Sequence, residues 1–202
     1  MKKLLAASLL SVAATGAFAQ ANAFDGFSAG VKVSSAGSST SVSQPHIPND
    51  ANSGFSANLG QQSVVPTVEL GYTYGVSKEI ALGLTATYDL SDTKAGTVDN
   101  LNFKTTQHYS INFKPGYVFN NATQLYAILG YNSMTGKASA QGYSANATFN
   151  GFGAGLGIQV LLNKNIYVQA EAQQITYSGV TKSSVTYTPS TTLGTVGLGY
   201  KF

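Results

Sequence analysis

The chain of 202 residues contains no cysteine, no tryptophan and no arginine, and only 9% of its residues are charged. Without cysteine it forms neither disulfides nor thiolate metal sites. A soluble domain carries about 25% charged residues, so the low charge indicates that something other than water covers much of the surface. Disorder does not fit, because 43% of the residues are hydrophobic and 11% are aromatic.

The N-terminus predicts export. Two lysines after the initiator methionine precede a short apolar stretch and the small-x-small triplet AFA, which ends at Ala19. This pattern is typical of a signal peptide, and the apolar stretch is too short to span a bilayer as a helix. We expect residues 1–19 to be cleaved and residues 20–202 to form a single domain; a second triplet would place cleavage after Ala23 instead. Loss of the two lysines leaves the chain nearly neutral, so nucleic-acid binding is not expected.

Eight segments of the remaining chain alternate with a period of two between apolar and small polar residues, which predicts strands with two unlike faces. They cover residues 27–34, 64–74, 80–90, 108–119, 125–132, 151–162, 166–173 and 195–202. A tilted strand of about ten residues crosses the hydrocarbon of a membrane, and most of these segments have that length.

The connections between these segments differ in length in a regular way. Short turns follow the second, fourth and sixth segments, whereas long loops rich in Ser, Thr, Gly and Asn are expected elsewhere. The expected loops are residues 35–63, 91–106, 133–148 and 176–190. An even number of strands with short turns at one end and long loops at the other is typical of barrels in the bacterial outer membrane.

The charges of the segments indicate which face meets lipid. All six lie on the small polar face: Lys32, Glu69, Asp89, Lys114, Glu171 and Lys201. A soluble barrel would place charges in water, and six would be few for its whole outer wall. We therefore predict an all-β, eight-stranded antiparallel up-and-down transmembrane β-barrel, with short periplasmic turns, long extracellular loops and the charges inside.

Aromatic residues support the same orientation. At the short-turn end of the apolar face are Tyr72, Tyr74, Tyr117, Phe119, Tyr200 and Phe202, and at the long-loop end are Tyr88, Tyr109, Tyr131 and Phe152. Two belts separated by aliphatic residues are what the two membrane interfaces select. The alternative is the ordinary preference of Tyr and Phe for strands.

The last eight residues, TVGLGYKF, resemble the C-terminal assembly signal of outer-membrane proteins, with Thr195, Gly197, Tyr200 and Phe202 at its characteristic positions. The opening FDGFSAGVKV and the eight-segment layout resemble the small OmpA/OmpX-type barrels and opacity-type surface antigens, within the porin-family outer-membrane proteins. Because the last strand ends at Phe202, we expect no periplasmic peptidoglycan-binding domain after it.

The resemblance implies a place in the outer membrane and a structural or surface role in envelope integrity, adhesion or as a surface antigen. It also implies contact with outer-membrane lipids including lipopolysaccharide, recognition by the barrel assembly machinery and periplasmic chaperones, and a monomer. Any extracellular ligand would bind the loops, above all residues 35–63 with Phe55 and Leu59.

Four of the inward charges lie near the middle of their strands, namely Lys32, Glu69, Lys114 and Glu171. Two cations and two anions at similar depth are expected to pair, because an unpaired charge in a narrow lumen is costly. The pairs would plug the lumen; the alternative is a narrow, porin-like channel for ions or small solutes. A row of alternate glycines from Gly151 to Gly157 leaves room for Tyr126, Tyr167 or the lysines, or for a ligand cavity.

One short motif allows an enzymatic interpretation. His108-Tyr109-Ser110 resembles the His-x-Ser segment of outer-membrane lipid A deacylases, in which a carboxylate completes the site. No Asp or Glu follows within a dozen residues, and both side chains are expected to face the lumen rather than lipid. We expect no catalytic residues, no metal and no cofactor; His46 stands alone in a segment with two prolines and is expected to be solvated.

Overall fold

The computed structural model describes residues 23–44, 54–98, 101–119, 122–140, 143–182 and 185–202. The predicted signal peptide and His46 lie outside them. The strands are β1 (Gly26–Gln44), β2 (Phe55–Gly75), β3 (Ile80–Asp89), β4 (Thr93–Val98), β5 (Leu101–Phe119), β6 (Thr123–Ala140), β7 (Tyr143–Leu161), β8 (Ile166–Tyr177), β9 (Val180–Lys182) and β10 (Val185–Lys201). No helix of the described residues is long and apolar enough to cross a membrane.

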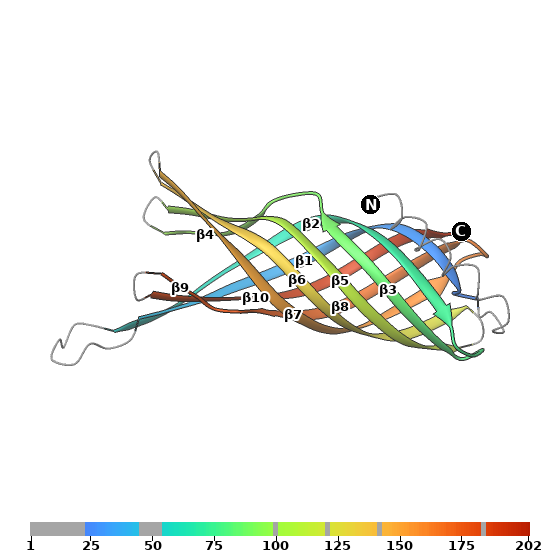
Figure 1. Cartoon of the computed structure of the whole chain (residues 1–202). Coiled ribbons are helices and arrows are strands. Elements are labelled where there is room, and N and C mark those ends of the chain that lie inside the picture. The colour runs from blue at the N-terminus through green and yellow to red at the C-terminus, as the bar shows by residue number, and fades with distance from the viewer. Residues whose placement is uncertain (1–22, 45–53, 99–100, 120–121, 141–142, 183–184) are drawn as a thin grey trace, which may run out of the picture.

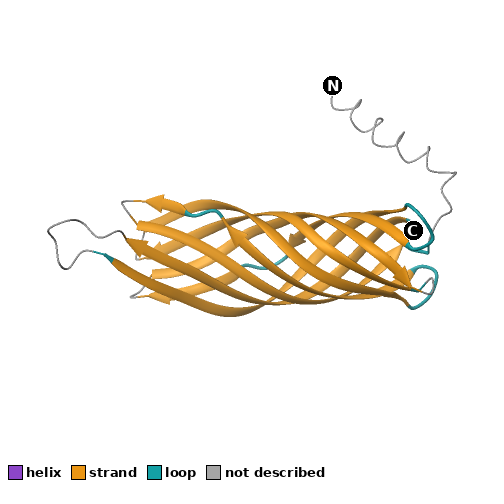
Figure 2. Ribbon diagram, turned by 90° about the horizontal axis from the view of Figure 1, so that it is seen from below, coloured by secondary structure: helices purple, strands orange, loops and turns teal. Residues whose placement is uncertain are grey.

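The strands form one antiparallel sheet that closes on itself (Figures 1 and 2). Neighbours follow the order β1-β2-β3-β5-β6-β7-β8-β10, and β10 returns to β1 with a register from Ser28↔Lys201 to Ser43↔Thr186. The short strand β4 pairs with β5, and β9 pairs with β10; they follow β3 and β8 after short breaks. The predicted eight-stranded barrel is thus confirmed, and closure gives each of the strands β1, β2, β3, β5, β6, β7, β8 and β10 two neighbours for its backbone hydrogen bonds.

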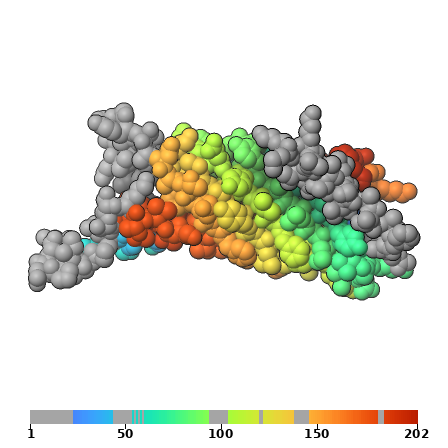
Figure 3. All heavy atoms as spheres, in the orientation of Figure 1, coloured from blue at the N-terminus to red at the C-terminus, as the bar shows by residue number. Residues whose placement is uncertain are grey.

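The two faces of the barrel are those that the alternation predicts. Outward side chains remain exposed, such as Leu70 at 65% and Leu156 at 64%, whereas Glu69 between its outward neighbours is only 3% exposed. Figure 3 shows the strands as oblique bands around an elongated body. Large apolar side chains on the outside of a closed barrel require lipid around them.

The segments predicted as long loops consist largely of strand. β1 continues to Gln44 and β2 begins at Phe55, so most of residues 35–63 is a hairpin that extends the barrel wall. β4 and β9 lie at this same end of the barrel, opposite the C-terminus (Figure 1). The strands extend further at their extracellular ends than the sequence predicted. Outside lipid both faces tolerate polar residues, so the alternation of apolar and polar residues weakens although the strands remain paired.

Candidate functional site in the barrel lumen

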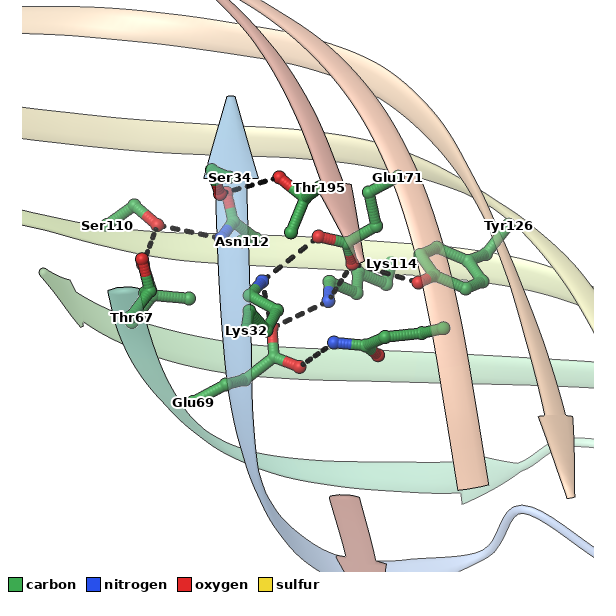
Figure 4. A network of polar contacts seen from close by, with 12 residues as sticks. Lys32, Ser34, Thr67, Glu69, Ser110, Asn112, Lys114, Tyr126, Glu171 and Thr195 are labelled. Atoms are coloured by element: carbon green, nitrogen blue, oxygen red, sulfur yellow. Dashed lines mark hydrogen bonds and ion pairs between the residues drawn. The ribbon is translucent and has the colours of Figure 1, made fainter. Parts of the chain in front are cut away.

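The four predicted charges meet in the middle of the lumen as a closed ring of ion pairs (Figure 4). Lys32 Nζ lies 2.9 Å from Glu69 Oε2 and 3.0 Å from Glu171 Oε2. Lys114 Nζ lies 2.8 Å from Glu69 Oε2 and 2.7 Å from Glu171 Oε1. Each lysine therefore contacts both glutamates, and we call these four residues the ion-pair ring.

Glycines on adjacent strands make room for the ring. Each charged residue is paired in register with one: Lys32 with Gly197, Glu69 with Gly30, Lys114 with Gly83 and Glu171 with Gly157. Long side chains can therefore cross a narrow lumen without displacing a neighbour. This correspondence explains why glycine is frequent on the inward face.

Two further inward residues complete the polar contacts of the ring. Tyr126 donates its hydroxyl hydrogen to Glu171 Oε1 at 2.8 Å, and Gln169 donates from Nε2 to Glu69 Oε1 at 2.9 Å. The sequence interpretation did not assign either residue to the network. The available signal was that Gln169 stands two residues before Glu171 on the inward face of its segment.

Aromatic and amide side chains pack against the row of alternate glycines in β7, from Gly151 to Gly157. A Cβ atom on Gly157 would lie 2.5 Å from the ring of Tyr126, so the predicted space for Tyr126 is confirmed. Tyr167, another of the side chains proposed for this space, packs instead against Gly199 of β10 and Gly30 of β1. β8, which carries Tyr167, pairs with both β7 and β10, and this side chain lies toward β10.

Apolar side chains cluster at the periplasmic end of the lumen. Phe24, Ala81 and Val118 are 3%, 0% and 3% exposed and form one cluster, with Leu161 packed against it. Phe24 precedes β1, and the other residues lie at the strand ends next to the short turns. We call this cluster below the ion-pair ring the apolar seal; the alternation pattern did not predict it.

Above the ring, a second polar cluster surrounds His108 and Ser110, which face inward as predicted. His108 Nδ1 lies 2.8 Å from Asp89 Oδ2, and Thr67 donates to Asp89 Oδ1 at 2.7 Å. The carboxylate that the motif lacked in sequence is thus supplied by β3. Ser110 Oγ, however, lies 2.6 Å from Thr87 Oγ1 and accepts from Asn112 at 2.8 Å.

These contacts do not form a nucleophile with its base. Nε2 of His108 has no hydrogen-bond partner among the described residues, so it does not activate Ser110. A bulge in β5 sets this geometry: Gln107 has a φ of 53°, and the register with β6 shifts between Thr106 and Tyr109. Bulges of this kind redirect neighbouring side chains.

The described part of the chain contains no group of three or more His, Cys, Asp or Glu side chains that could hold a metal ion. The lumen therefore combines a neutral ion-pair ring, an apolar seal and a hydroxyl and amide lining that includes the Asp89–His108 pair, inside a wall whose outside is apolar. That combination points to a barrel built for a membrane.

The family model described as outer membrane protein beta-barrel domain matches residues 4–202. The chain belongs to this family. It is accordingly a protein of the bacterial outer membrane, as its sequence predicts. No curated protein sequence matches it significantly.

Several solved outer-membrane barrels are similar in fold. Neisserial surface protein A (NspA) has 14% identity and a TM-score of 0.57, with 88% of this chain and 98% of that chain covered. The outer membrane protease OmpT from Escherichia coli has 8% identity and a TM-score of 0.54, with 92% and 99% covered. Ail, the attachment invasion locus protein of Yersinia pestis, has 18% identity and a TM-score of 0.48, with 88% and 99% covered. At these identities the likeness to NspA and OmpT shows the fold alone.

In this outer-membrane barrel, the aromatic residues lie outside as predicted. All ten belt residues except Tyr72 are more than a third exposed, and Tyr72 packs against Phe27 with ring centroids 4.7 Å apart. Phe27 is a further member of the periplasmic belt that the prediction omitted. At the C-terminus Tyr200 and Phe202 face outward, whereas Thr195 is buried inside; their role in assembly stays a prediction.

Proposed function

We propose that this outer-membrane protein is a non-catalytic barrel with a structural or surface-interaction role, in envelope integrity, adhesion or as a surface antigen, and that its lumen is plugged. The ion-pair ring carries this proposal. Both cations and both anions are buried and mutually paired, so the ring leaves no free charge to guide ions through the lumen.

Two barriers in series support the plugged state. An ion that passed the ring would have to separate buried pairs, and breaking such pairs leaves uncompensated charge at a cost of several kcal/mol. Below the ring, the apolar seal around Phe24 consists of buried hydrocarbon side chains, which do not replace the water around a permeating ion. Both barriers would have to open together for steady conduction.

The extended strands support a role at the cell surface. Beyond the outer belt, exposed positions of β1 carry hydroxyl groups, as at Ser35, Ser39 and Ser43. This uncharged surface stands above the membrane, where it could meet lipopolysaccharide or an extracellular ligand. The side chains of Phe55 and Leu59 lie outside the described ones. The fold does not select the role, since a surface protein and a protease share it.

The non-catalytic assignment rests on the environment of Ser110. Its oxygen is held by Thr87 and Asn112, and the nearby His108 uses its other nitrogen for Asp89. The side chain is 4% exposed inside the lumen, where a membrane lipid does not reach it. We propose a monomer without cofactor that contacts outer-membrane lipids and, during biogenesis, the barrel assembly machinery and periplasmic chaperones.

Planar-bilayer recordings test the plug. We expect the intact barrel to show no large steady conductance, and Lys32→Ala combined with Phe24→Ala to raise the open fraction, because this variant removes part of each barrier. Glu79→Gln in a periplasmic turn is the control. Large steady conductance of the unmodified barrel would overturn the plugged state in favour of a narrow channel for ions or small solutes.

A further inference from the structure

Three lysines occupy neighbouring positions in the barrel wall beyond the outer belt of aromatic residues. Lys104 of β5 pairs in register with Lys137 of β6 on one side and with Lys94 of β4 on the other. These strands lie at the end of the barrel opposite the C-terminus (Figure 1). The side chains of Lys104 and Lys137 are exposed. We call Lys94, Lys104 and Lys137 the lysine row.

Lys104 and Lys137 face outward from the barrel. Thr105 and Met134 line the lumen. Lys104 is one residue away from Thr105, and Lys137 is three residues after Met134. Successive residues of a strand point to opposite faces of the sheet, so both lysines lie on the outer face. They are therefore directed sideways, toward whatever surrounds the barrel.

The positive charge of the row is not compensated by the described part of the chain. Like charges that lie directly opposite each other in a ladder repel and destabilise the sheet. No ion pair joins Lys104 or Lys137 to a carboxylate among the described residues. The next residue across the ladder is the uncharged Asn146 of β7, in register with Lys137. The closest acid along the chain is Asp92, which is exposed in the break between β3 and β4. An anion from outside the chain would therefore stabilise the row.

This charge is confined to one side of the barrel. The parts of β1, β2, β7 and β10 beyond the outer belt contain no charged residue, namely 34–44, 55–66, 143–150 and 185–194. β9 contains a single lysine, Lys182, which pairs with Val185. The β4–β6 side is thus the one place in this part of the wall where lysines of adjacent described strands stand next to each other.

The height of the row matches the charged layer of lipopolysaccharide. Lys137 is four positions beyond Ser133, which pairs with the belt residue Tyr109. With a rise of about 3.4 Å per residue and a strand tilt of about 40°, the row lies about 10 Å above the belt. Lipopolysaccharide carries phosphates on its lipid A sugars, and phosphates and carboxylates on the adjoining core sugars, just outside the hydrocarbon. Lysines directed sideways at this height therefore meet its anionic groups.

We propose that the lysine row binds the phosphate groups of a lipopolysaccharide molecule in the outer leaflet, with Lys104 and Lys137 as the contacts. The inference rests on the proposed contact with outer-membrane lipids and assigns that contact a site. Lysine binds phosphate as a point charge, and two lysines on strands about 5 Å apart can share one phosphate group. A soluble polyanion would have to reach the outer wall through the surrounding lipopolysaccharide, so the lipid is the favoured partner.

Native mass spectrometry of the full barrel in detergent micelles tests this inference. The barrel is titrated with deep-rough lipopolysaccharide, with the same lipid after enzymatic removal of its phosphates, and with inositol hexakisphosphate as a soluble polyanion. We expect the phosphorylated lipid to bind about tenfold more tightly than the dephosphorylated lipid, because each lysine near an anionic lipid surface adds to binding. Binding of inositol hexakisphosphate is expected to be much weaker.

Variants separate the row from general attraction between lysines and anionic lipid. Lys104→Gln combined with Lys137→Gln is expected to raise the Kd of the phosphorylated lipid about tenfold. The matched control is Lys78→Gln combined with Lys164→Gln, which removes the same charge from exposed positions in two periplasmic turns and is expected to leave the Kd within about twofold. Circular dichroism verifies that both variants fold.

Three results would overturn the proposed site: equal binding of both lipid forms, equal binding of inositol hexakisphosphate, or an equal loss of affinity in the two double variants. Equal binding of both lipid forms would leave the proposed lipid contact in place, whereas binding of neither form would overturn that contact as well. The plugged lumen is tested separately by conductance, so a conducting barrel that binds the phosphorylated lipid at the row would refute the plug alone.

Discussion

The Nζ atom of Lys114 lies 2.7 Å from Oε1 of Glu171, although 57 positions separate the two residues along the chain. β5 and β8 are not neighbours in the sheet, since β6 and β7 lie between them. The pair therefore spans the lumen and joins walls that share no backbone hydrogen bonds. The ion-pair ring thus acts as a set of cross-links between strands.

Glu171→Gln should destabilise the barrel by about 3 kcal/mol, because it leaves two buried lysines to share Glu69. The free energy of unfolding is measured by urea titration in lipid vesicles with circular dichroism, which suits a chain without tryptophan.

Glu79→Gln, at an exposed position of the turn between β2 and β3, is the control and should change stability by less than about 0.5 kcal/mol. Lys114→Met should reduce the effect of Glu171→Gln when the two are combined, because removing both partners leaves less uncompensated charge. Additive losses would show that the ring does not act as a unit.

Gly157→Ala should cost about 1–3 kcal/mol, because the added methyl group would lie 2.5 Å from the ring of Tyr126 and would move its hydroxyl away from Glu171. The control is Gly194→Ala, where the added Cβ meets no atom within 4 Å. In a Tyr126→Leu background, Gly157→Ala should lower the free energy of unfolding by less. An equal loss of stability in both backgrounds would contradict the packing of Tyr126 against Gly157.

Leu156→Lys should destabilise the folded barrel by about 2–4 kcal/mol, since it places a charge in hydrocarbon between the two aromatic belts. Ser39→Lys, on the exposed face of β1 beyond the outer belt, should have an effect within about 0.5 kcal/mol. Vesicle unfolding measures both. Similar costs at the two positions would contradict the position of the membrane on the barrel.

Phe202→Ser should reduce the amount of folded protein in the outer membrane several-fold while leaving refolding of the purified chain in detergent unchanged. Phe202 is 73% exposed and contacts Tyr200, with ring centroids 5.1 Å apart, so its loss removes little internal packing. Phe152→Ser, at 60% exposure on β7, is the matched control. If both variants assemble equally poorly in cells, the C-terminal residues have no special role in assembly.

The orientation of each strand could be predicted because lipid and lumen impose different side chains on alternate residues. Val31 and Lys32 show this directly, at 59% and 7% exposure. Alternation did not predict a strand at residues 35–44, where β1 leaves the membrane and most of its outward residues are serines. Alternation identifies a strand only where its two faces meet different surroundings, such as lipid and lumen. It no longer does so where both faces meet water.

By itself, the sequence determined the membrane-facing surface and the four charges inside, because both follow from composition at alternate positions. Only the tertiary structure decided which inward residues meet: Asp89 reaches His108 across adjacent strands, and Tyr126 reaches Glu171 across β7. Those contacts depend on register, on the bulge at Gln107 and on closure between β1 and β10. Each is set by the whole sheet, so no single segment carries it.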